Sequence, residues 1–358
     1  MRVSLVIYGS LDSISGGYLY DRVLVEYLRS RGDQVKIVSL PRRNYPSHLS
    51  DNLRPSLLKS LLQGKWDLLL QDELNHPSLF WLNRRLQGRV EYPIVTIVHH
   101  LRCCEVHPKW RNLIYRLVEK QYLESVDGFI FNSRSTQLEV EKLVGEGKPS
   151  VVASPGRDRL KGTITREQIV ERCGRPGPLQ ILFLGNVIPR KGLHTLLKGL
   201  SSLPAETWQL EVVGNTGLDL RYTEMIKRQV GDRGLSHRVS FKGLLSDDEV
   251  IESLSRSHLL AVPSSYEGFG IIYLEAMGFG LPVIASGTGG AVDLITHGRE
   301  GALVKPGDFA AVAEFVEMLG RNRDQLLRMS LRSFERRMAF PTWAQTAERI
   351  RNFLLRQI

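Results

Sequence analysis

Apolar and polar residues follow two alternating patterns along this chain. Short apolar runs, typical of buried strands, are separated by longer segments in which apolar residues recur every three or four positions, as on one face of a helix. The strand-like runs are 3–8, 35–40, 68–70, 94–98, 128–131 and 151–153 in the first half, and 181–184, 209–213, 239–241, 259–262, 282–285 and 302–304 in the second. Strands that alternate with helices favour parallel sheets, so the sequence predicts an α/β protein.

The interval between the two halves predicts the division into domains. A polar stretch with several Gly and Pro residues, 156–178, interrupts the pattern of strands and helices. Because 358 residues exceed the usual size of one hydrophobic core, we expect two facing Rossmann-like domains, 1–160 and 179–340, joined by a linker at 161–178. Ligands of such sheets bind beyond the carboxyl ends of the strands, so residues that directly follow strands are candidate site residues.

Composition and charge narrow the class of protein. Charged residues make up 24% of the chain and hydrophobic residues 42%, which is typical of a soluble globular protein. No apolar run approaches the roughly 20 residues that cross a bilayer, and the first residues lack a signal-peptide core, so we expect a cytoplasmic protein. Cys103, Cys104 and Cys173 have neither the number nor the spacing of a disulfide framework or a metal site. The net charge of +10 fits a phosphate-rich ligand or an anionic membrane, and without a nucleic-acid-binding signature we expect no nucleic-acid partner.

The stretch 264–290 carries the most specific chemistry. Gly268, Phe269 and Gly270 form a turn before an apolar helix, and a helix start leaves backbone N–H groups that bind anions. Glu275 lies about one and a half turns into that helix, and Glu267 lies in the loop before it. Two carboxylates on either side of a bound pyrophosphate can accept hydrogen bonds from hydroxyl groups, which suits a nucleotide sugar.

This stretch resembles a known family of enzymes. Residues 264–270 follow an apolar strand, and the next strand leads into a Gly-rich loop at 287–290. Together with Glu267 and Glu275 they resemble the E-x7-E region of the retaining glycosyltransferases of family four, which have the two-domain GT-B fold. The resemblance implies transfer of a hexose from a nucleotide diphosphate sugar with retention at the anomeric carbon. It also implies a C-terminal helix, 341–358, that crosses back to the first domain.

Two further loops resemble the diphosphate-binding segments of that family. Gly16 and Gly17 follow the first strand and open a helix, and in the family a Gly-Gly pair at this place contacts the donor diphosphate. Residues 185–192 resemble the G-R-x-x-x-x-K-G signature, whose Arg and Lys bind the diphosphate, with Lys191 in the place of the Lys. Asn186 stands where the signature has Arg, which removes a bidentate phosphate contact. We expect Arg190 to substitute for it; a weaker enzyme or the loss of catalysis are the alternatives.

Two other segments resemble the part of the family site near the nucleobase. Residues 212–217, which include Gly214, are similar to the V-G-x-G segment with one residue inserted, and residues 241–244, which end in Leu244, are similar to the F-x-G-x segment. The resemblance as a whole implies donor contacts from Gly16, Gly17, Arg190, Lys191, Gly214, Leu244, Gly268, Phe269, Gly270 and Glu275.

The same resemblance implies the catalytic residues. Lys191 would stabilise the charge on the departing diphosphate, and Glu267 would hold the hydroxyls of the sugar. His99 matches the His of the family's T-x-H-D, with His100 in place of the Asp, and would position the sugar or the acceptor. The polar run 71–76, which follows another strand, is a further candidate for the acceptor side. No acidic pair stands where a metal would be needed, so we expect neither a metal nor a cofactor.

The segment 109–120 surrounds an apolar stripe with basic and aromatic residues. This pattern is typical of helices that lie on an anionic membrane. It is also typical of a helix that covers a sheet and exposes a basic face. The first interpretation predicts peripheral contact with the inner face of a membrane, and both interpretations stay open at this level.

These features predict a metal-independent, retaining hexosyltransferase that acts on a hydroxyl acceptor, whether a glycan, a lipid or a small molecule. The first alternative is a noncatalytic GT-B subunit that binds a nucleotide sugar or a partner glycosyltransferase, because Asn186 and His100 depart from the family pattern. The second alternative is a nucleotide-sugar epimerase of the same fold, whose signatures match the regions of Lys191 and Glu267 less well.

Overall fold

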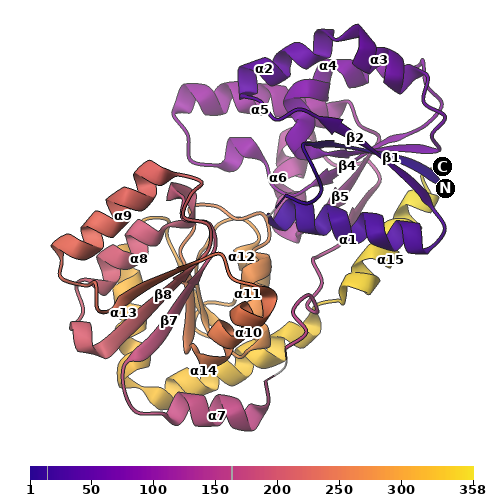
Figure 1. Cartoon of the computed structure of the whole chain (residues 1–358). Helices are drawn as coiled ribbons and strands as arrows, with labels where there is room; N and C mark the ends of the chain where they lie inside the picture. Colours follow the sequence, from indigo (N-terminus) through magenta and orange to yellow (C-terminus); the bar gives the residue numbers. More distant parts are fainter. Residues whose placement is uncertain (14, 163) are drawn as a thin grey trace. The chain divides into compact units, whose positions relative to one another are not determined.

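The computed structural model describes residues 1–13, 15–162 and 164–358, whose contacts divide the chain into two compact units (Figure 1). The first unit comprises Met1–Gly156 together with Pro341–Ile358, and the second comprises Arg157–Phe340. Each unit buries its own cluster of hydrophobic side chains. The two units are therefore described separately below.

The first unit is built around a parallel sheet. Within its described residues the sheet has six strands in the order β2-β1-β3-β4-β5-β6. The strands are β1 (Arg2–Tyr8), β2 (Gln34–Leu40), β3 (Leu68–Asp72), β4 (Ile94–Val98), β5 (Gly128–Phe131) and β6 (Ser150–Val152). The order reverses between β1 and β3, because β2 lies on one side of β1 and the later strands lie on the other. Loops at the carboxyl ends of strands at such a reversal are the usual ligand-binding loops of open α/β sheets.

Helices connect these strands and complete the first unit. They are α1 (Gly16–Ser30), α2 (Tyr45–Leu49), α3 (Pro55–Leu62), α4 (His76–Leu86), α5 (Lys109–Glu124), α6 (Arg134–Val144) and α15 (Trp343–Leu355). The last of these, α15, comes from the C-terminal end of the chain. Its Thr346 Oγ1 donates to the carbonyl of Ser154 at 2.7 Å, and its Arg351 Nε donates to Asp33 at 2.7 Å. These bonds attach α15 to the first unit.

The second unit contains a sheet of the Rossmann type. Its described residues form six parallel strands in the order β12-β11-β10-β7-β8-β9. The strands are β7 (Leu179–Leu184), β8 (Trp208–Val213), β9 (Val239–Gly243), β10 (Leu259–Val262), β11 (Val283–Ser286) and β12 (Gly301–Val304). The chain runs outward from β7 to β9, returns to β10 beside β7, and continues in the opposite direction. The reversal thus lies between β7 and β10.

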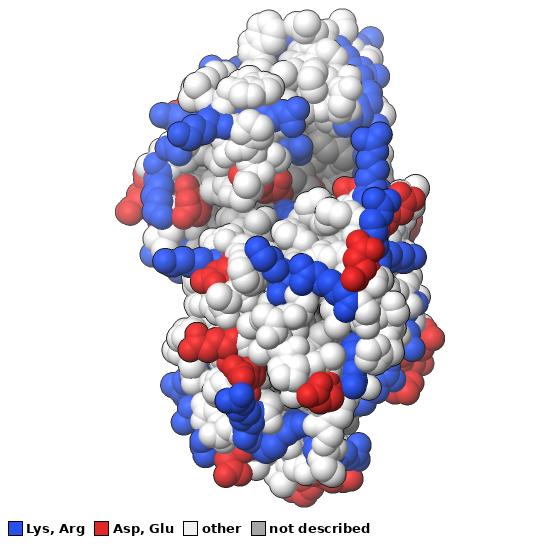
Figure 2. Space-filling model, turned by 90° about the vertical axis from the view of Figure 1, so that its left-hand side faces the viewer, with Lys and Arg blue, Asp and Glu red and all other residues white. Residues whose placement is uncertain are grey.

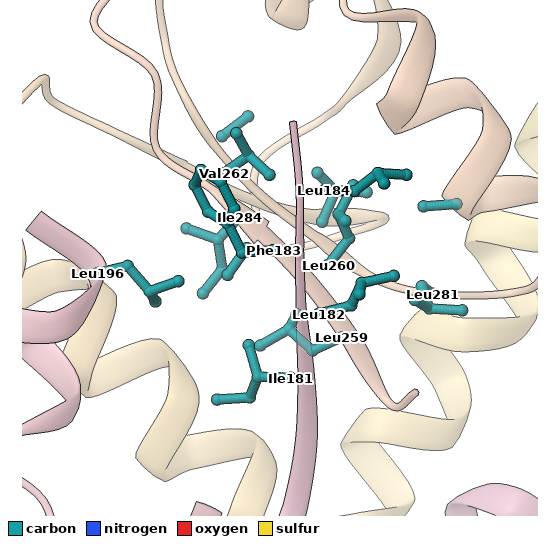
Figure 3. Close-up of a cluster of buried hydrophobic side chains, with 14 of the residues drawn as sticks. Ile181, Leu182, Phe183, Leu184, Leu196, Leu259, Leu260, Val262, Leu281 and Ile284 are labelled. Atoms are coloured by element: carbon teal, nitrogen blue, oxygen red, sulfur yellow. The ribbon is translucent and has the colours of Figure 1, made fainter. Parts of the chain in front are cut away.

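The helices of the second unit cover a continuous apolar core. They are α7 (Arg166–Gly174), α8 (Leu193–Leu200), α9 (Leu220–Asp232), α10 (Asp247–Arg256), α11 (Ile271–Gly278), α12 (Ala291–Leu294), α13 (Phe309–Arg321) and α14 (Arg323–Arg336). Figure 3 shows side chains of β7 and β10, among them Phe183 and Leu260, packed together in this core. β10 is buried along its whole length and β7 at every residue except the half-buried Gln180, as is typical of parallel strands covered by helices on both faces. The core holds the ends of these two strands in place.

The α/β prediction is confirmed, because every strand-like run of the sequence lies in a strand of one of the two sheets or overlaps one. The helices formed by residues 1–13, 15–162 and 164–358 include none that is both long and apolar enough to cross a membrane.

The stretch 161–178, which the sequence marks as a linker, differs from that expectation. It contains α7, and Ile169 and Cys173 of this helix are buried in the core of the second unit. A capping box between Thr165 and Gln168 starts the helix, with each side chain bonding to the backbone of the other residue. Gly156 and Gly162 precede α7, and the other Gly and Pro residues that suggested a linker lie at its last residue, 174, and beyond it, at 176–178. The boundary between the units falls earlier, at Gly156.

Candidate active site

Three candidate site residues of the second unit, Arg190, Lys191 and Glu267, lie where its strand order reverses. The 3₁₀ turn η4 (Pro189–Lys191) follows β7, and the loop that contains Glu267 follows β10. Because β7 and β10 are neighbouring parallel strands, both loops leave the same edge of the sheet. Ser265 N donates to the carbonyl of Arg190 at 2.8 Å, so the two loops are joined backbone to backbone. The sheet thereby brings together residues that are 76 positions apart in the sequence.

Glu267 is the centre of a small network of charges. Lys191 Nζ donates to Glu267 Oε1 at 2.6 Å, and Ser264 Oγ donates to the same oxygen at 2.7 Å. Arg190 Nη1 lies 3.5 Å from this oxygen and donates to the carbonyl of Tyr266 at 2.7 Å. The side chains of Lys191 and Glu267 are only 13% and 11% exposed, whereas Arg190 is about one-third exposed. Two cations therefore converge on one nearly buried carboxylate.

The pKa values follow from this arrangement. Burial by itself would raise the pKa of Glu267, but the charges of Lys191 and Arg190 outweigh it and hold that pKa at about 2. Burial lowers the pKa of Lys191, with Glu267 opposing and Arg190 reinforcing the shift. When ionised, the three side chains of Arg190, Lys191 and Glu267 together carry two positive charges and one negative charge. Their net positive charge at the end of a strand favours an anionic ligand.

The glycine-rich loop after β11 holds the backbone of Glu267 in place. Gly290 N donates to the carbonyl oxygen of Glu267 at 2.9 Å. Gly289 has a φ of +59°, and a Cβ atom at this position would lie 2.0 Å from the same carbonyl oxygen. Only glycine fits such a backbone conformation and such a close approach without displacing its neighbour. The loop thus has a role in positioning the catalytic candidate Glu267.

We expect Gly289→Ala to lower the free energy of unfolding of the second unit by about 1–3 kcal/mol and to weaken donor binding, because it forces the Glu267 carbonyl to move. Gly287→Ala is the matched control, since a Cβ atom there meets its nearest neighbour at 3.7 Å, an ordinary contact. Thermal unfolding of both variants with and without donor measures the two effects. If Gly289→Ala and Gly287→Ala unfolded at the same temperature and were stabilised equally by the donor, Gly289 would have no positioning role.

The turn at 268–270 forms the start of α11, as predicted. Gly270 is the N-cap residue with a φ of +90°, and α11 begins at Ile271. The ring of Phe269 is buried and packs edge to face against Phe340, so the contribution of this residue to a ligand site comes from its backbone. The first turn of α11 carries no acidic side chain that would compete with a bound anion.

Glu275 has a partner that sequence reasoning missed. Its carboxylate accepts a hydrogen bond from Arg159 Nε, and Arg159 Nη1 donates to Asp247 at 2.7 Å. Burial raises the pKa of Glu275, and the bond from Arg159 opposes the shift. No local pattern could have predicted the pair, because Arg159 precedes Glu275 by 116 positions. Glu275, which was predicted to contact the donor, is therefore an ion-paired, nearly buried carboxylate in this structure.

The two candidates near the nucleobase lie at adjacent strand ends. Gly214 follows β8, and its N–H donates to the carbonyl of Gly243, the last residue of β9, at 2.7 Å. A Cβ atom at Gly214 would lie 2.0 Å from the carbonyl oxygen of Gly185, which follows β7. Leu244 directly follows β9 and is 55% exposed. Glycine at two strand ends thus allows these loops to pack closely beside the loop of Lys191.

In the first unit, the structure brings together Gly17 and His99. A Cβ atom at Gly17 would lie 3.2 Å from His99 Cδ2, so the ring packs on the start of α1, which Gly16 opens. His99 Nε2 lies 3.1 Å from Asp21 Oδ1, a contact that the sequence did not suggest. Burial lowers the pKa of His99, but the charge and hydrogen bond of Asp21 outweigh it and raise the pKa to about 9. His99 is therefore a cation beside the start of a helix.

The polar run 71–76 was expected on the acceptor side, and in this structure its polar side chains lie inside the first unit. Its polar side chains are at most 2% exposed, and most of them bond to other groups inside the first unit. They are Gln71, Asp72, Glu73, Asn75 and His76. Burial and the charge of Asp21 raise the pKa of Asp72 to about 7, with His99 opposing the shift. The run supports the sheet from within and does not line a surface.

Two buried groups in the described part of the first unit each contain a histidine and two carboxylates within 4.8 Å of one another. They are Asp21, Asp72 and His99, and Glu73, His76 and Glu119. Each could hold a metal ion, although a shared proton or the ion pair of Asp21 with His99 also accounts for such contacts. The absence of a metal requirement consequently stays a prediction.

Comparison with known proteins identifies the second unit. Residues 166–336 match the family model described as glycosyl transferases group 1. The second unit belongs to this family. A D-inositol 3-phosphate glycosyltransferase of Nocardia farcinica is 28% identical to this chain over 309 residues, which cover 80% of the chain and 66% of the relative. A GDP-mannose-dependent alpha-(1-6)-phosphatidylinositol monomannoside mannosyltransferase of Mycobacterium tuberculosis is 30% identical over 183 residues, 49% of the chain and 46% of the relative.

Solved structures extend the likeness of fold to both units of the chain. Sucrose-phosphate synthase from Thermosynechococcus elongatus has a TM-score of 0.82 at 21% identity and covers 99% of this chain and 98% of its own. Anabaena HepE in complex with UDP-glucose has a TM-score of 0.78 at 18% identity and covers 99% of this chain and 100% of its own. The GT-B fold predicted from the sequence is confirmed. The chain spans 66% or less of the length of the two sequence relatives named above.

Proposed function

We propose that this protein transfers a hexose from a nucleotide diphosphate sugar to a hydroxyl acceptor, with retention at the anomeric carbon. The observation that carries the proposal is the contact of Lys191 and Arg190 with Glu267 at the strand reversal of a group 1 glycosyltransferase unit. The names of the relatives support it, since one is a GDP-mannose-dependent mannosyltransferase and another is a glycosyltransferase that acts on an inositol phosphate.

In the proposed reaction the bond between the anomeric carbon and the diphosphate oxygen breaks. A new bond forms from that carbon to the acceptor oxygen, whose proton is released as the nucleoside diphosphate takes up negative charge. Lys191, Arg190 and the N–H groups at the start of α11 would stabilise this charge, which is often the largest contribution to catalysis. Glu267 would orient Lys191 through the 2.6 Å hydrogen bond and would accept hydrogen bonds from hydroxyl groups of the sugar.

We further propose that Arg190 supplies the charge that Asn186 lacks. Arg190 contacts the same carboxylate as Lys191, lies on the same turn η4 and keeps about one-third of its side chain exposed. A guanidinium that is held by one carbonyl bond and a 3.5 Å contact with the Glu267 carboxylate can turn towards a phosphate that replaces this contact. In the first unit, the cationic His99 beside Gly17 would add positive charge at the Gly-Gly pair.

Donor binding tests the proposal. Ligand binding raises the thermal midpoint of the folded protein by mass action, so we expect one nucleotide class among UDP-, GDP- and ADP-sugars to raise it. The increase should be lost in Lys191→Ala and should be unaffected by a chelator. If no donor shifts the midpoint of a well-folded sample, the proposal fails and the noncatalytic subunit becomes the better explanation of Asn186. A chelator-sensitive increase would contradict metal independence alone.

A further inference from the structure

Helix α5 has an apolar face that no other described part of the first unit covers. The face consists of Trp110, Leu113, Ile114 and Leu117, which are 61%, 60%, 41% and 53% exposed. Their spacing of three, one and three positions places them on one side of the helix. We call this set the outer face of α5. Val106, 75% exposed, lies just before the helix.

The outer face is separate from the face that packs on the unit. The buried residues of α5 are Tyr115, Glu119, Tyr122 and Leu123, which lie on the opposite side of the helix, and α5 packs against α4. A helix that merely covers a protein core needs one apolar stripe. This helix has two, and the second one faces outward. A contiguous exposed apolar patch of this kind is typical of a surface that binds a partner.

Basic side chains surround the outer face. Lys109, Arg111, Arg116 and Lys120 of α5 are all exposed. The acids of the helix do not balance these charges near the patch, because Glu119 is buried and Glu124, at the end of the helix, pairs with Arg84 and Lys120. Figure 2 views the molecule from the side on which α5 lies in Figure 1, and there blue Lys and Arg groups border white, uncharged surface. The patch combines apolar contact with positive charge.

We propose that the outer face of α5 docks the first unit onto an anionic lipid surface. Such a surface accepts aliphatic and Trp side chains to a shallow depth while its headgroups attract the surrounding Lys and Arg. A second copy of the chain fits less well, because a symmetric pairing of this face would bring the basic residues of both copies together. The proposal is independent of transferase activity, since no residue of the patch belongs to the candidate active site.

Binding to vesicles tests the docking. We expect the full chain to sediment with vesicles of phosphatidylcholine and phosphatidylglycerol at low salt, to bind phosphatidylcholine alone weakly, and to detach at high salt. The double variant Leu113→Ser with Leu117→Ser should bind the anionic vesicles at least about tenfold less tightly. Replacing Arg116 and Lys120 by Gln should weaken the binding and flatten its dependence on salt.

Leu218→Ser with Leu220→Ser is the matched control, because these leucines of the second unit are 59% and 64% exposed. It should bind vesicles as the unchanged protein does. The docking proposal is overturned if the unchanged protein ignores anionic vesicles, or if the α5 and control variants bind equally well. It is also overturned if sedimentation velocity without lipid finds a dimer that only the α5 variant dissociates. Melting curves of both variants show whether each is folded.

Discussion

Lys191→Ala is expected to lower the rate of sugar transfer by about a hundredfold or more, because removal of one preorganised donor to a developing negative charge typically costs that much. The ammonium group of Lys191 is held at the strand reversal by its 2.6 Å hydrogen bond to Glu267 and by its place on η4. The measurement is kcat and kcat/KM with the donor that raises the thermal midpoint. Loss of kcat together with kcat/KM would mean that the ammonium acts mainly in the transition state.

Two further variants distinguish the effect of the charge of Lys191 on transfer from its effect on the stability of the fold. Lys191→Arg keeps a cation beside Glu267 and should retain more activity than the alanine variant. Lys198→Ala removes an exposed lysine of α8 in the same unit and should leave transfer unchanged. Since a buried carboxylate loses a partner in Lys191→Ala, assays must be run well below the melting midpoint of that variant. A folded alanine variant with nearly unchanged turnover would remove Lys191 from the mechanism.

The second large effect concerns stability and pH. Glu267→Gln is expected to destabilise the second unit by about 3 kcal/mol at pH 7, since the pKa of Glu267 falls from 4.5 to about 2 on folding. Because the folded pKa is the lower one, this stabilisation is complete above the unfolded value of 4.5 and is lost as the pH falls through 2. The difference between unchanged protein and variant should thus shrink on acidification, by about 1 kcal/mol between pH 6 and pH 3.5.

Urea unfolding at several pH values measures this difference. Trp208 is the only tryptophan in the sequence of the second unit, so the ¹⁹F signal of a fluorinated Trp208 follows that unit in the intact chain. Glu317→Gln is the control, because Glu317 forms an exposed pair with Arg321 on α13 that should be worth less than about 1 kcal/mol. A pH-independent difference for Glu267→Gln would show that the charges of Lys191 and Arg190 do not depress its pKa.

The strands were predictable because buried parallel strands are short apolar runs, as in 181–184 and 259–262. The start of α11 was predictable for the same local reason, from Gly268 and Gly270. Helix α7 was missed, because the capping box of Thr165 and Gln168 lies in a stretch that looks like a linker. Arg159 and Asp21 were missed as partners of Glu275 and His99, since each pair is far apart in the sequence.

By itself, then, the sequence determined the α/β class, the positions of the strands and the resemblance that led to the family of the second unit. These depend on local periodicity and on short motifs, which are independent of how the chain folds back. Only the tertiary structure decided that Lys191 and Arg190 meet Glu267, that the run 71–76 is buried, and that α5 has a second apolar face. Those facts depend on strand order and on which side of each element is covered, and both are set by packing between segments distant in the sequence.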